Sequence, residues 1–292
     1  MTILDTIAEH TRVRVARDME KISREKVSAL AFEKAAAERG GENRFYSAVR
    51  RPGISFICEV KKASPSKGII DPVFDYLQIA SEYESAGAEA ISCLTEPEWF
   101  LGSDEIFTQI RARVQTPMLR KEFVVDEYQL YQAKLMGADC VLLIVSLMNE
   151  KILEKYLRIC AHLKLAALVE THDEEEIRTA VRAGSHMIGI NNRNLRDFSV
   201  DLTNAGRLGD LVPGDILLVA ESGVKTPEDA AALYRTGADA VLVGEALMRS
   251  KDKGEFLRLA REAAGLSQGS SGRTKEAAGH TQVPGNFREA AK

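Results

Sequence analysis

Four apolar segments of the sequence, each long enough to form a buried strand, end in titratable side chains. The segments are 55–60 (SFICEV), 116–122 (TPMLRKE), 165–170 (LAALVE) and 215–222 (DILLVAES). Their charged ends, in the same order, are Glu59 with Lys61, then Arg120 with Lys121 and Glu122, then Glu170, and then Glu221. A charge in a dry interior costs several kcal/mol unless it is paired. Carboxylates and amines that meet at one edge of a sheet can instead act as general acids and bases. The repetition weakens the alternative that each charge is a solvated loop residue.

Side-chain alternation along a strand indicates which of these charges share a face. Glu59 and Lys61 are two residues apart and point the same way, whereas Cys58 and Val60 point to the opposite face. In the second segment the inward-pointing charge is not determined, because residues 120–122 are all charged and alternation alone does not decide which of them points inward. We therefore predict a Glu–Lys pair at the rim of a sheet.

Two loops have the composition of a phosphate site. Ser222 and Gly223 follow Glu221, and Gly244 joins the last apolar segment directly to a helix start at Glu245. Unpaired N–H groups at a helix N-terminus attract anions. Turn glycines without a ligand remain the alternative for both loops.

Aromatic and amide side chains occupy two further loops. Trp99 and Phe100 either pack on the N-terminal part of the chain or form the wall of an aromatic pocket. The loop 191–195, NNRNL, offers amide donors and one Arg. His172 follows Glu170 by two residues, and we interpret it as a loop or helix-cap residue in preference to a catalytic base.

The elements that would position these residues follow from a repeated pattern, in which a helix ends at a glycine and a strand follows. The repeats are SAGAEAISCL, LMGADCVLLIV, RAGSHMIGI and RTGADAVLVG, and their glycines are Gly87, Gly137, Gly184 and Gly237, about 50 residues apart. With the four segments above they give eight aliphatic strands alternating with helices, which is typical of a parallel sheet covered on both faces. We predict an α/β fold, a closed (β/α)8 TIM barrel, with an open doubly wound sheet as the alternative. In such a barrel the charged strand ends gather at one mouth.

The flanking segments differ from the barrel in composition. Residues 1–50 have the pattern of amphipathic helices and not of a signal peptide, so we predict an N-terminal helical extension packed on the barrel. Residues 1–264 would form this single TIM-barrel domain. Residues 265–292 are rich in Gly and Ser, and we expect a disordered tail because they cannot bury enough apolar surface.

Composition and charge argue against several classes of protein. A net charge of -4 argues against a nucleic-acid binder, which usually has a basic stripe. The longest apolar run, 140–148, is much shorter than the roughly 20 residues that cross a membrane. His and Cys residues lack metal-binding spacing, so no metal is expected. We expect buried reduced thiols at Cys58, Cys93, Cys140 and Cys160, and a cytoplasmic protein that is a monomer or a weak homo-oligomer.

Eight sequence blocks, in the same order, resemble indole-3-glycerol-phosphate synthase. They are EVKKASPSKG, TEPEWFLGS, PMLRKEFVVDEYQ, GADCVLLIV, LVETHDEEE, IGINNRNLRDF, VAESGVKTPED and VLVGEALM. The similarity runs from about residue 3 to about residue 263, whereas other phosphate-binding barrels share only the Ser-Gly and Gly-Glu loops. The tail has no counterpart in the family pattern, and the chain resembles the form without a fused second barrel.

The resemblance implies a decarboxylating ring closure of 1-(2-carboxyphenylamino)-1-deoxyribulose 5-phosphate, with no metal or organic cofactor. By resemblance Lys121 is the general acid, and Glu170 assists the loss of water. Lys61, paired with Glu59, binds the substrate carboxylate, while Asn191 and Glu221 orient the substrate. The implied phosphate site consists of Ser64, Gly223, Gly244 and Glu245, and the implied aromatic pocket of Trp99, Phe100, Phe123 and Leu142, with Arg193 and Leu195 at further pocket positions.

Two other functions remain as alternatives. One is another phosphate-binding barrel enzyme, either phosphoribosylanthranilate isomerase or an aldolase that uses Lys121 as a Schiff base. The other is a non-catalytic barrel that binds a phosphorylated ligand. All the expected charged strand ends are present, which disfavours the non-catalytic alternative.

Overall fold

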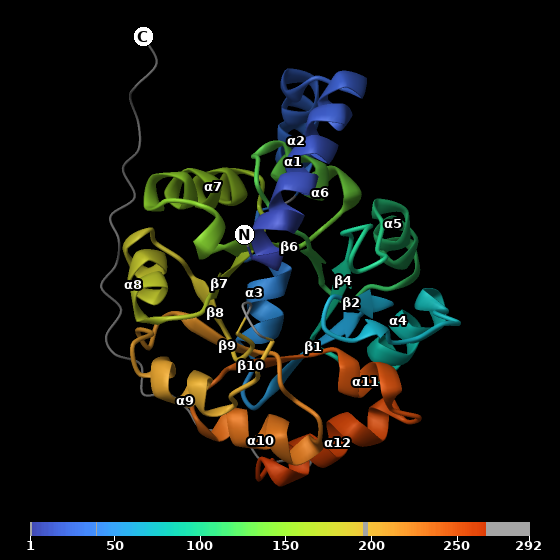
Figure 1. Ribbon diagram of the computed structural model, residues 1–292, viewed down its shortest axis with the longest axis vertical. Coiled ribbons are helices and arrows are strands. Elements are labelled where there is room, and N and C mark those ends of the chain that lie inside the picture. Colours follow the sequence, from blue (N-terminus) through green and yellow to red (C-terminus); the bar gives the residue numbers. More distant parts are fainter. Residues whose placement is uncertain (1, 39, 195–197, 267–292) are drawn as a thin grey trace.

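Eight parallel strands close into a barrel in the computed structural model, which describes residues 2–38, 40–194 and 198–266 (Figure 1). Each strand pairs with the next one along the chain, and β1 also pairs with β10 to close the cylinder. The strands are β1 (Ser55–Val60), β4 (Ala90–Leu94), β5 (Met118–Lys121), β6 (Cys140–Ile144), β7 (Ala166–Thr171), β8 (Met187–Asn191), β9 (Leu217–Glu221) and β10 (Ala240–Val243). The predicted (β/α)8 barrel is confirmed, and the open sheet is wrong.

Helices surround the barrel in the order expected for strand–helix units (Figure 1). They are α4 (Tyr76–Ser85), α5 (Asp104–Arg113), α6 (Tyr128–Met136), α7 (Glu150–His162), α8 (Glu174–Arg182), α9 (Thr203–Gly209), α10 (Pro227–Arg235), α11 (Glu245–Arg249) and α12 (Lys253–Ala263), with a short 3-10 helix η1 (Val145–Leu147). The four repeated glycines follow α4, α6, α8 and α10 and all have positive φ. They end these helices as predicted, because glycine tolerates that conformation at little cost.

Two apolar clusters share the strands between them. Ile57 belongs to the inner cluster, which fills the barrel, and Cys58 and Val60 belong to the outer cluster, which packs under the helices. The predicted alternation along the first strand is therefore confirmed. All four cysteines are buried free thiols, also as predicted.

Three helices precede the barrel, and two of them cover its opposite ends. They are α1 (Ile3–Lys21), α2 (Arg24–Ala37) and α3 (Arg44–Val49). Phe45 and Val49 of α3 are part of the inner cluster, and the Asn43 amide donates to the backbone oxygens of Asp139 and Lys164, where strands begin. The start of α1 lies over the other end (Figure 1), and Leu4 contributes to the same cluster.

Helix α1 is fixed to the chain that follows β5. The Arg14 guanidinium donates to Oε2 of the buried Glu122 at 2.8 Å, and the Tyr128 hydroxyl donates to backbone oxygens of Asp18 and Ile22. Because buried charges are stable only when they are paired, the Arg14–Glu122 contact couples the position of α1 to the end of β5.

The ends of the described chain bear on two predictions. Leu266 packs on the outer cluster, and the rest of the predicted tail, from residue 267, lies outside the described residues. Within the described ranges no helix combines the length and apolar character needed to span a membrane.

The buried ring of Phe45 generates a stability prediction. Phe45 is 0% exposed, so Phe45→Ala should lower the free energy of unfolding by about 3–5 kcal/mol, measured by urea denaturation. Phe32→Ala is the matched control, because this ring on α2 is 41% exposed and its loss should cost about 1 kcal/mol or less. Equal losses of unfolding free energy in the two variants would contradict the conclusion that α3 closes one end of the barrel.

Candidate active site

The charged strand ends point into the barrel mouth because each continues the inward face of its strand. Each charged residue follows a member of the inner cluster by two positions. The pairs are Leu119 with Lys121, Leu168 with Glu170, and Val219 with Glu221. Successive side chains alternate between faces, so a residue two positions further along points the same way. Burial of the apolar face thus fixes the direction of the charges.

This parity settles the choice that the sequence left open at residues 120–122. Lys121 points inward, whereas Arg120 points outward and donates to Asp104 Oδ1 at 2.8 Å and to the Gln129 oxygen at 3.0 Å. Glu122 is held by Arg14 and by the Thr95 hydroxyl. Glu122 also lines the cavity, but Lys121 is the one of the three that continues the inward face of β5.

A cavity of about 540 Å³ opens at this mouth, within the usual range for small-molecule sites. Fifteen of the seventeen predicted site residues line it. They are Glu59, Lys61, Ser64, Phe100, Lys121, Phe123, Leu142, Glu170, Asn191, Arg193, Glu221, Ser222, Gly223, Gly244 and Glu245. Trp99 does not line it, and Leu195 lies outside the described residues.

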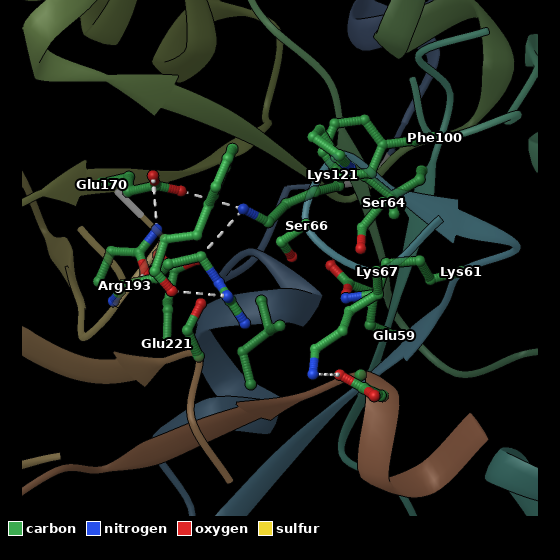
Figure 2. A pocket seen from close by; sticks show the side chains of 18 of the residues that line it. Glu59, Lys61, Ser64, Ser66, Lys67, Phe100, Lys121, Glu170, Arg193 and Glu221 are labelled. Carbon is green, nitrogen blue, oxygen red and sulfur yellow. Dashed lines mark hydrogen bonds and ion pairs between the residues drawn. The ribbon is translucent and has the colours of Figure 1, made fainter. Parts of the chain in front are cut away.

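The centre of the site is Lys121, held between two carboxylates (Figure 2). Its Nζ lies 3.0 Å from Glu170 Oε2 and 3.2 Å from Glu221 Oε2. Burial by itself would lower the pKa of Lys121, but Glu170, Glu221 and Glu59 outweigh burial and raise that pKa above its usual value. Lys121 is therefore a protonated amine that can donate a proton to a bound group.

Glu170 is the most heavily contacted of the carboxylates. Its Oε1 accepts from Asn191 Nδ2 at 3.0 Å and lies 3.3 Å from His172 Nε2. Burial would raise the pKa of Glu170, but Lys121, His172 and Asn191 lower it below the usual range. Glu170 is therefore ionised at neutral pH.

Glu221 has the opposite electrostatic balance. Burial, together with the nearby charge of Glu170, raises the pKa of Glu221 to about 7, against the opposing effect of Lys121. Its Oε1 is buried and has no hydrogen-bond partner among the described residues. Two carboxylates of unlike pKa beside one amine are what acid–base chemistry at neutral pH requires.

A second ion pair stands at the end of β1. Lys61 Nζ donates to Glu59 Oε2, as the sequence predicts. A Cβ atom at Gly244 would lie 2.4 Å from Glu59 Oε2 and 2.7 Å from Lys61 Nζ, so a side chain at this position would displace the ion pair. The pair therefore fills the space that Gly244 leaves open.

The side of the cavity near Gly244 carries positive charge. Lys61, Lys67 and Lys225 all line it, and Lys67 Nζ lies 3.9 Å from Glu245 Oε2. Ser64 comes from a hairpin of β2 (Ala63–Ser64) and β3 (Gly68–Ile69) over the mouth.

The loop between β9 and α10 lines the same region with an unusual backbone conformation. Ser222 and Gly223 both have positive φ, 68° and 97°, and consecutive turns of this kind can direct N–H groups to one anion. The position supports the predicted anion site beside the lysines.

Phe100 and Phe123 form the aromatic wall, with ring centroids 5.9 Å apart. The Glu96 carboxylate accepts the backbone N–H groups of residues 98–100 and so fixes this loop. Trp99 instead packs edge-on against His10 of α1, at 4.9 Å between centroids. Phe100 thus lines the cavity and Trp99 packs on the N-terminal helix, because adjacent loop residues point in different directions.

The loop after β8 brings Asn191 and Arg193 into the cavity. The Arg193 backbone N–H donates to Asn191 Oδ1 at 3.0 Å, and Arg193 Nη1 donates to the Phe198 oxygen at 3.2 Å. These bonds orient the Asn191 amide toward Glu170.

Sequence reasoning missed two contributions to the site. Ile3, Leu4 and Ile7 of α1 line the cavity, although their amphipathic spacing indicated only packing. The ring of His172 contacts Glu170, and the cap of α8 is Asp173 instead. The two-residue spacing from Glu170 was the available signal for His172. Within the described part of the chain, no cluster of three His, Cys, Asp or Glu is arranged to hold a metal ion.

Known proteins resemble this chain over most of its length. A family model described as indole-3-glycerol phosphate synthase matches residues 4–259. The protein of that name from Ruminiclostridium cellulolyticum is 49% identical, over 90% of this chain and 100% of its own length. The one from Lachnoclostridium phytofermentans is 44% identical, over 88% and 97%. A solved N-acetylmannosamine-6-phosphate 2-epimerase from Clostridium perfringens has a TM-score of 0.58 at 14% identity, over 73% of this chain and 95% of its own, and shows the fold alone.

The raised pKa of Glu221 predicts a gain of stability when its charge is removed. The folded state keeps a proton on Glu221 that the unfolded state, with a pKa of 4.5, releases, so stability falls as pH rises from about 5 through about 7. Glu221→Gln should therefore raise the free energy of unfolding at pH 8 by on the order of 1–3 kcal/mol, and by much less at pH 5. Denaturation at both pH values measures this, with the exposed Glu33→Gln as control. A variant less stable than wild type at pH 8 would refute the assignment.

Proposed function

The chain belongs to the indole-3-glycerol phosphate synthase family, and we propose that residues at its barrel mouth divide the acid, base and binding roles of that family's reaction. The reaction closes 1-(2-carboxyphenylamino)-1-deoxyribulose 5-phosphate to indole-3-glycerol phosphate, carbon dioxide and water, in tryptophan biosynthesis. The protein is accordingly a decarboxylating carbon–carbon lyase that acts on a small phosphorylated substrate.

Lys121 is the general acid of the ring closure. The ring carbon that bears the carboxylate attacks the substrate carbonyl carbon, and the carbonyl oxygen gains negative charge as the bond forms. The observation that carries this role is the position of Nζ, 3.0 Å and 3.2 Å from two carboxylates in the cavity. The carboxylates keep the amine protonated, and a proton donor beside a developing oxyanion lowers the barrier.

Lys61 binds the substrate carboxylate that is later lost as carbon dioxide. Its ammonium lies in the cavity and is held in place by Glu59. An ammonium attracts the carboxylate before the ring closes, and loss of carbon dioxide then restores the aromatic ring. Because Gly244 has no Cβ, the ion pair can occupy the space beside the end of β10.

Glu170 handles the protons of the last step, the loss of water. It shares Lys121 with Glu221 and receives the Asn191 amide, so a proton can move among groups that are already in contact. The new hydroxyl leaves as water after it gains a proton, and the carbon–nitrogen segment loses one to form the indole double bond. Asn191 and Glu221 orient the substrate beside Glu170.

The phosphate and the ring occupy opposite sides of the cavity. The phosphate lies against Ser64, Ser222, Gly223 and the backbone N–H groups at Gly244 and Glu245, near Lys67. The ring packs among apolar side chains of the barrel and α1, which are Phe100, Phe123, Leu142, Ile3 and Ile7. Arg193 and Leu195 complete the pocket in this proposal.

The electrostatics disfavour an aldolase that forms a Schiff base at Lys121. A nucleophilic amine must lose its proton, and enzymes achieve this by lowering the pKa of the lysine. Here three carboxylates raise the pKa of Lys121. The site is arranged for proton donation and against nucleophilic attack by this amine.

Three broader features complete the proposal. Residues 1–264 act as one domain, and the protein works in the cytoplasm as a monomer or a weak homo-oligomer. Four buried thiols and the biosynthetic family support the location, and the net charge of -4 supports a small-molecule substrate in place of nucleic acid.

Turnover of the carboxyphenylamino substrate tests the acid and base roles. The purified protein should release carbon dioxide and form the fluorescent indole product. Lys121→Ala and Glu170→Gln should each lower kcat by about 10²- to 10⁴-fold, because each removes a proton-transfer group. Lys26→Ala and Glu33→Gln, exposed on α2, are the matched controls and should keep wild-type kcat.

Circular dichroism must show that all four variants are folded. Tight substrate binding by the wild type without carbon dioxide release would favour a non-catalytic barrel. Near wild-type turnover in both Lys121→Ala and Glu170→Gln would refute the role assignment.

Backbone recognition of the phosphate predicts different effects at neighbouring positions. Glu245→Ala should change KM by less than about 3-fold, because the backbone N–H is retained and only a rim charge is lost. Gly244→Ala should raise KM and lower kcat together, each by at least about 10-fold, because the new Cβ displaces the Glu59–Lys61 pair. Steady-state kinetics measures both, and a larger effect from Glu245→Ala than from Gly244→Ala would contradict the proposal.

A further inference from the structure

The imidazole of His172 lies between two carboxylates, one of which is the proposed acid–base group. Nε2 is 3.3 Å from Glu170 Oε1, and Nδ1 is 3.1 Å from Glu176 Oε2. The Nε2 contact has the distance of an ion pair without the geometry of a good hydrogen bond, and Nε2 has no other partner among the described residues. The side chain is only 18% exposed, so this arrangement is part of the interior.

The start of α8 fixes the carboxylate on the far side of the ring. Asp173 caps the helix by accepting the Glu176 N–H at 2.9 Å, which places Glu176 in the first turn. Glu176 Oε2 then accepts the backbone N–H of His172 at 2.7 Å and also faces its ring. One carboxylate oxygen therefore holds both the backbone and the side chain of His172.

The two contacts favour a charged ring. A neutral imidazole has one N–H and one lone pair, so one of its nitrogens would direct a lone pair at a carboxylate oxygen. The imidazolium carries an N–H on both nitrogens, so neither carboxylate faces a lone pair. The charged groups that face the ring are Glu170 from β7 and Glu176 from α8. Burial would lower the pKa of His172, but these carboxylates outweigh it and raise that pKa to about 10.

His172 reaches the reaction only through Glu170. It is not among the residues that line the cavity, whereas Glu170 is. The two oxygens of Glu170 are divided, because Oε2 faces Lys121 and Oε1 faces Asn191 and His172. A cation on the Oε1 side leaves Oε2 directed to the amine and the substrate.

We propose that His172 is a positioning residue whose imidazolium is held in place by Glu176. The imidazolium orients Glu170 and sets the acid strength of the Glu170 carboxyl group. The inference rests on the proposed role of Glu170 in the loss of water. Glu170 is ionised at rest and first takes up the proton that the substrate carbon beside the nitrogen loses. A fixed positive charge then makes the protonated carboxyl a stronger acid, which favours donation of that proton to the leaving hydroxyl. After the donation, the same charge stabilises the carboxylate.

The charge state of the ring is tested first, without turnover. In ¹⁵N-labelled wild-type protein, the His172 ring should show two protonated nitrogens at pH 8. The ring signals are assigned to His172 because they disappear in His172→Gln. If that variant does not fold, through-bond correlation of the ring to the His172 backbone assigns them. In Glu170→Gln the ring should titrate at least about 1 pH unit lower, because one carboxylate is gone. A neutral His172 in wild type at pH 8 would overturn the proposal.

The pH dependence of kcat tests the effect on Glu170. His172→Gln keeps a hydrogen-bond donor and removes the charge, so the Glu170 carboxylate should take up a proton at a higher pH. The acidic limb of the kcat profile should move up by about 1 unit, while KM changes by less than about 3-fold. The exposed His162→Gln should leave the limb in place.

An unmoved limb in folded His172→Gln, or an equal shift in His162→Gln, would refute the positioning role. If His172→Gln does not fold, Glu176→Gln replaces it, and a smaller shift in the same direction is then required. Failure of the underlying function is distinguishable. Full turnover by Glu170→Gln would remove the role of Glu170, whereas the nitrogen spectrum would still report whether His172 is charged.

Discussion

The structure depends on a cluster of charged side chains that lie together in the partly buried mouth of the barrel. Lys121 is stable at the barrel mouth because Glu170 and Glu221 contact its amine, and neither carboxylate would be stable there without it. The cost of removing these ions from water is offset only when strands from different parts of the barrel end at the same level. The closed sheet provides this alignment, since each strand is held by neighbours on both sides.

The two ends of the barrel serve this cluster in different ways. At the end where strands begin, α3 inserts Phe45 and Val49 and completes an apolar interior that makes the strands rigid. At the mouth, α1 places Ile3, Leu4 and Ile7 on the cavity and is tied by Arg14 to the residue after Lys121. The N-terminal extension is therefore part of the site, because it excludes water from one side and fixes the end of β5.

Unequal surroundings make the carboxylates of one site chemically different. Glu170 has Asn191, Lys121 and His172 around it and stays ionised. Burial and the charge of Glu170 instead raise the pKa of Glu221 to about 7, and one oxygen of Glu221 is buried with no partner among the described residues. Such a difference suits proton transfer, and it lowers the stability of the folded state above about pH 7. The activity and the stability of this fold thus place opposite demands on the same side chain.

The sequence by itself determined the barrel and most of the site, because both follow from local periodicity. Aliphatic strands, glycine helix ends and charges two residues beyond buried positions predicted the cavity residues, and the family motifs named their chemistry. Strand alternation did not decide between Lys121 and its neighbours. The loop sequence did not decide whether Trp99 and Phe100 pack on the N-terminal segment or form the wall of a pocket, and it favoured a loop or cap residue over a catalytic base for His172. Each of those choices depends on how the folded chain arranges its neighbours: the closed sheet buries Leu119 and so directs Lys121 inward, His10 of α1 receives Trp99, and the turn from β7 into α8 brings Glu170 and Glu176 to the two ring nitrogens of His172. Only the tertiary structure decides them, because the buried side of a strand, a contact from a segment far along the chain and the path of a turn leave no pattern in the local sequence.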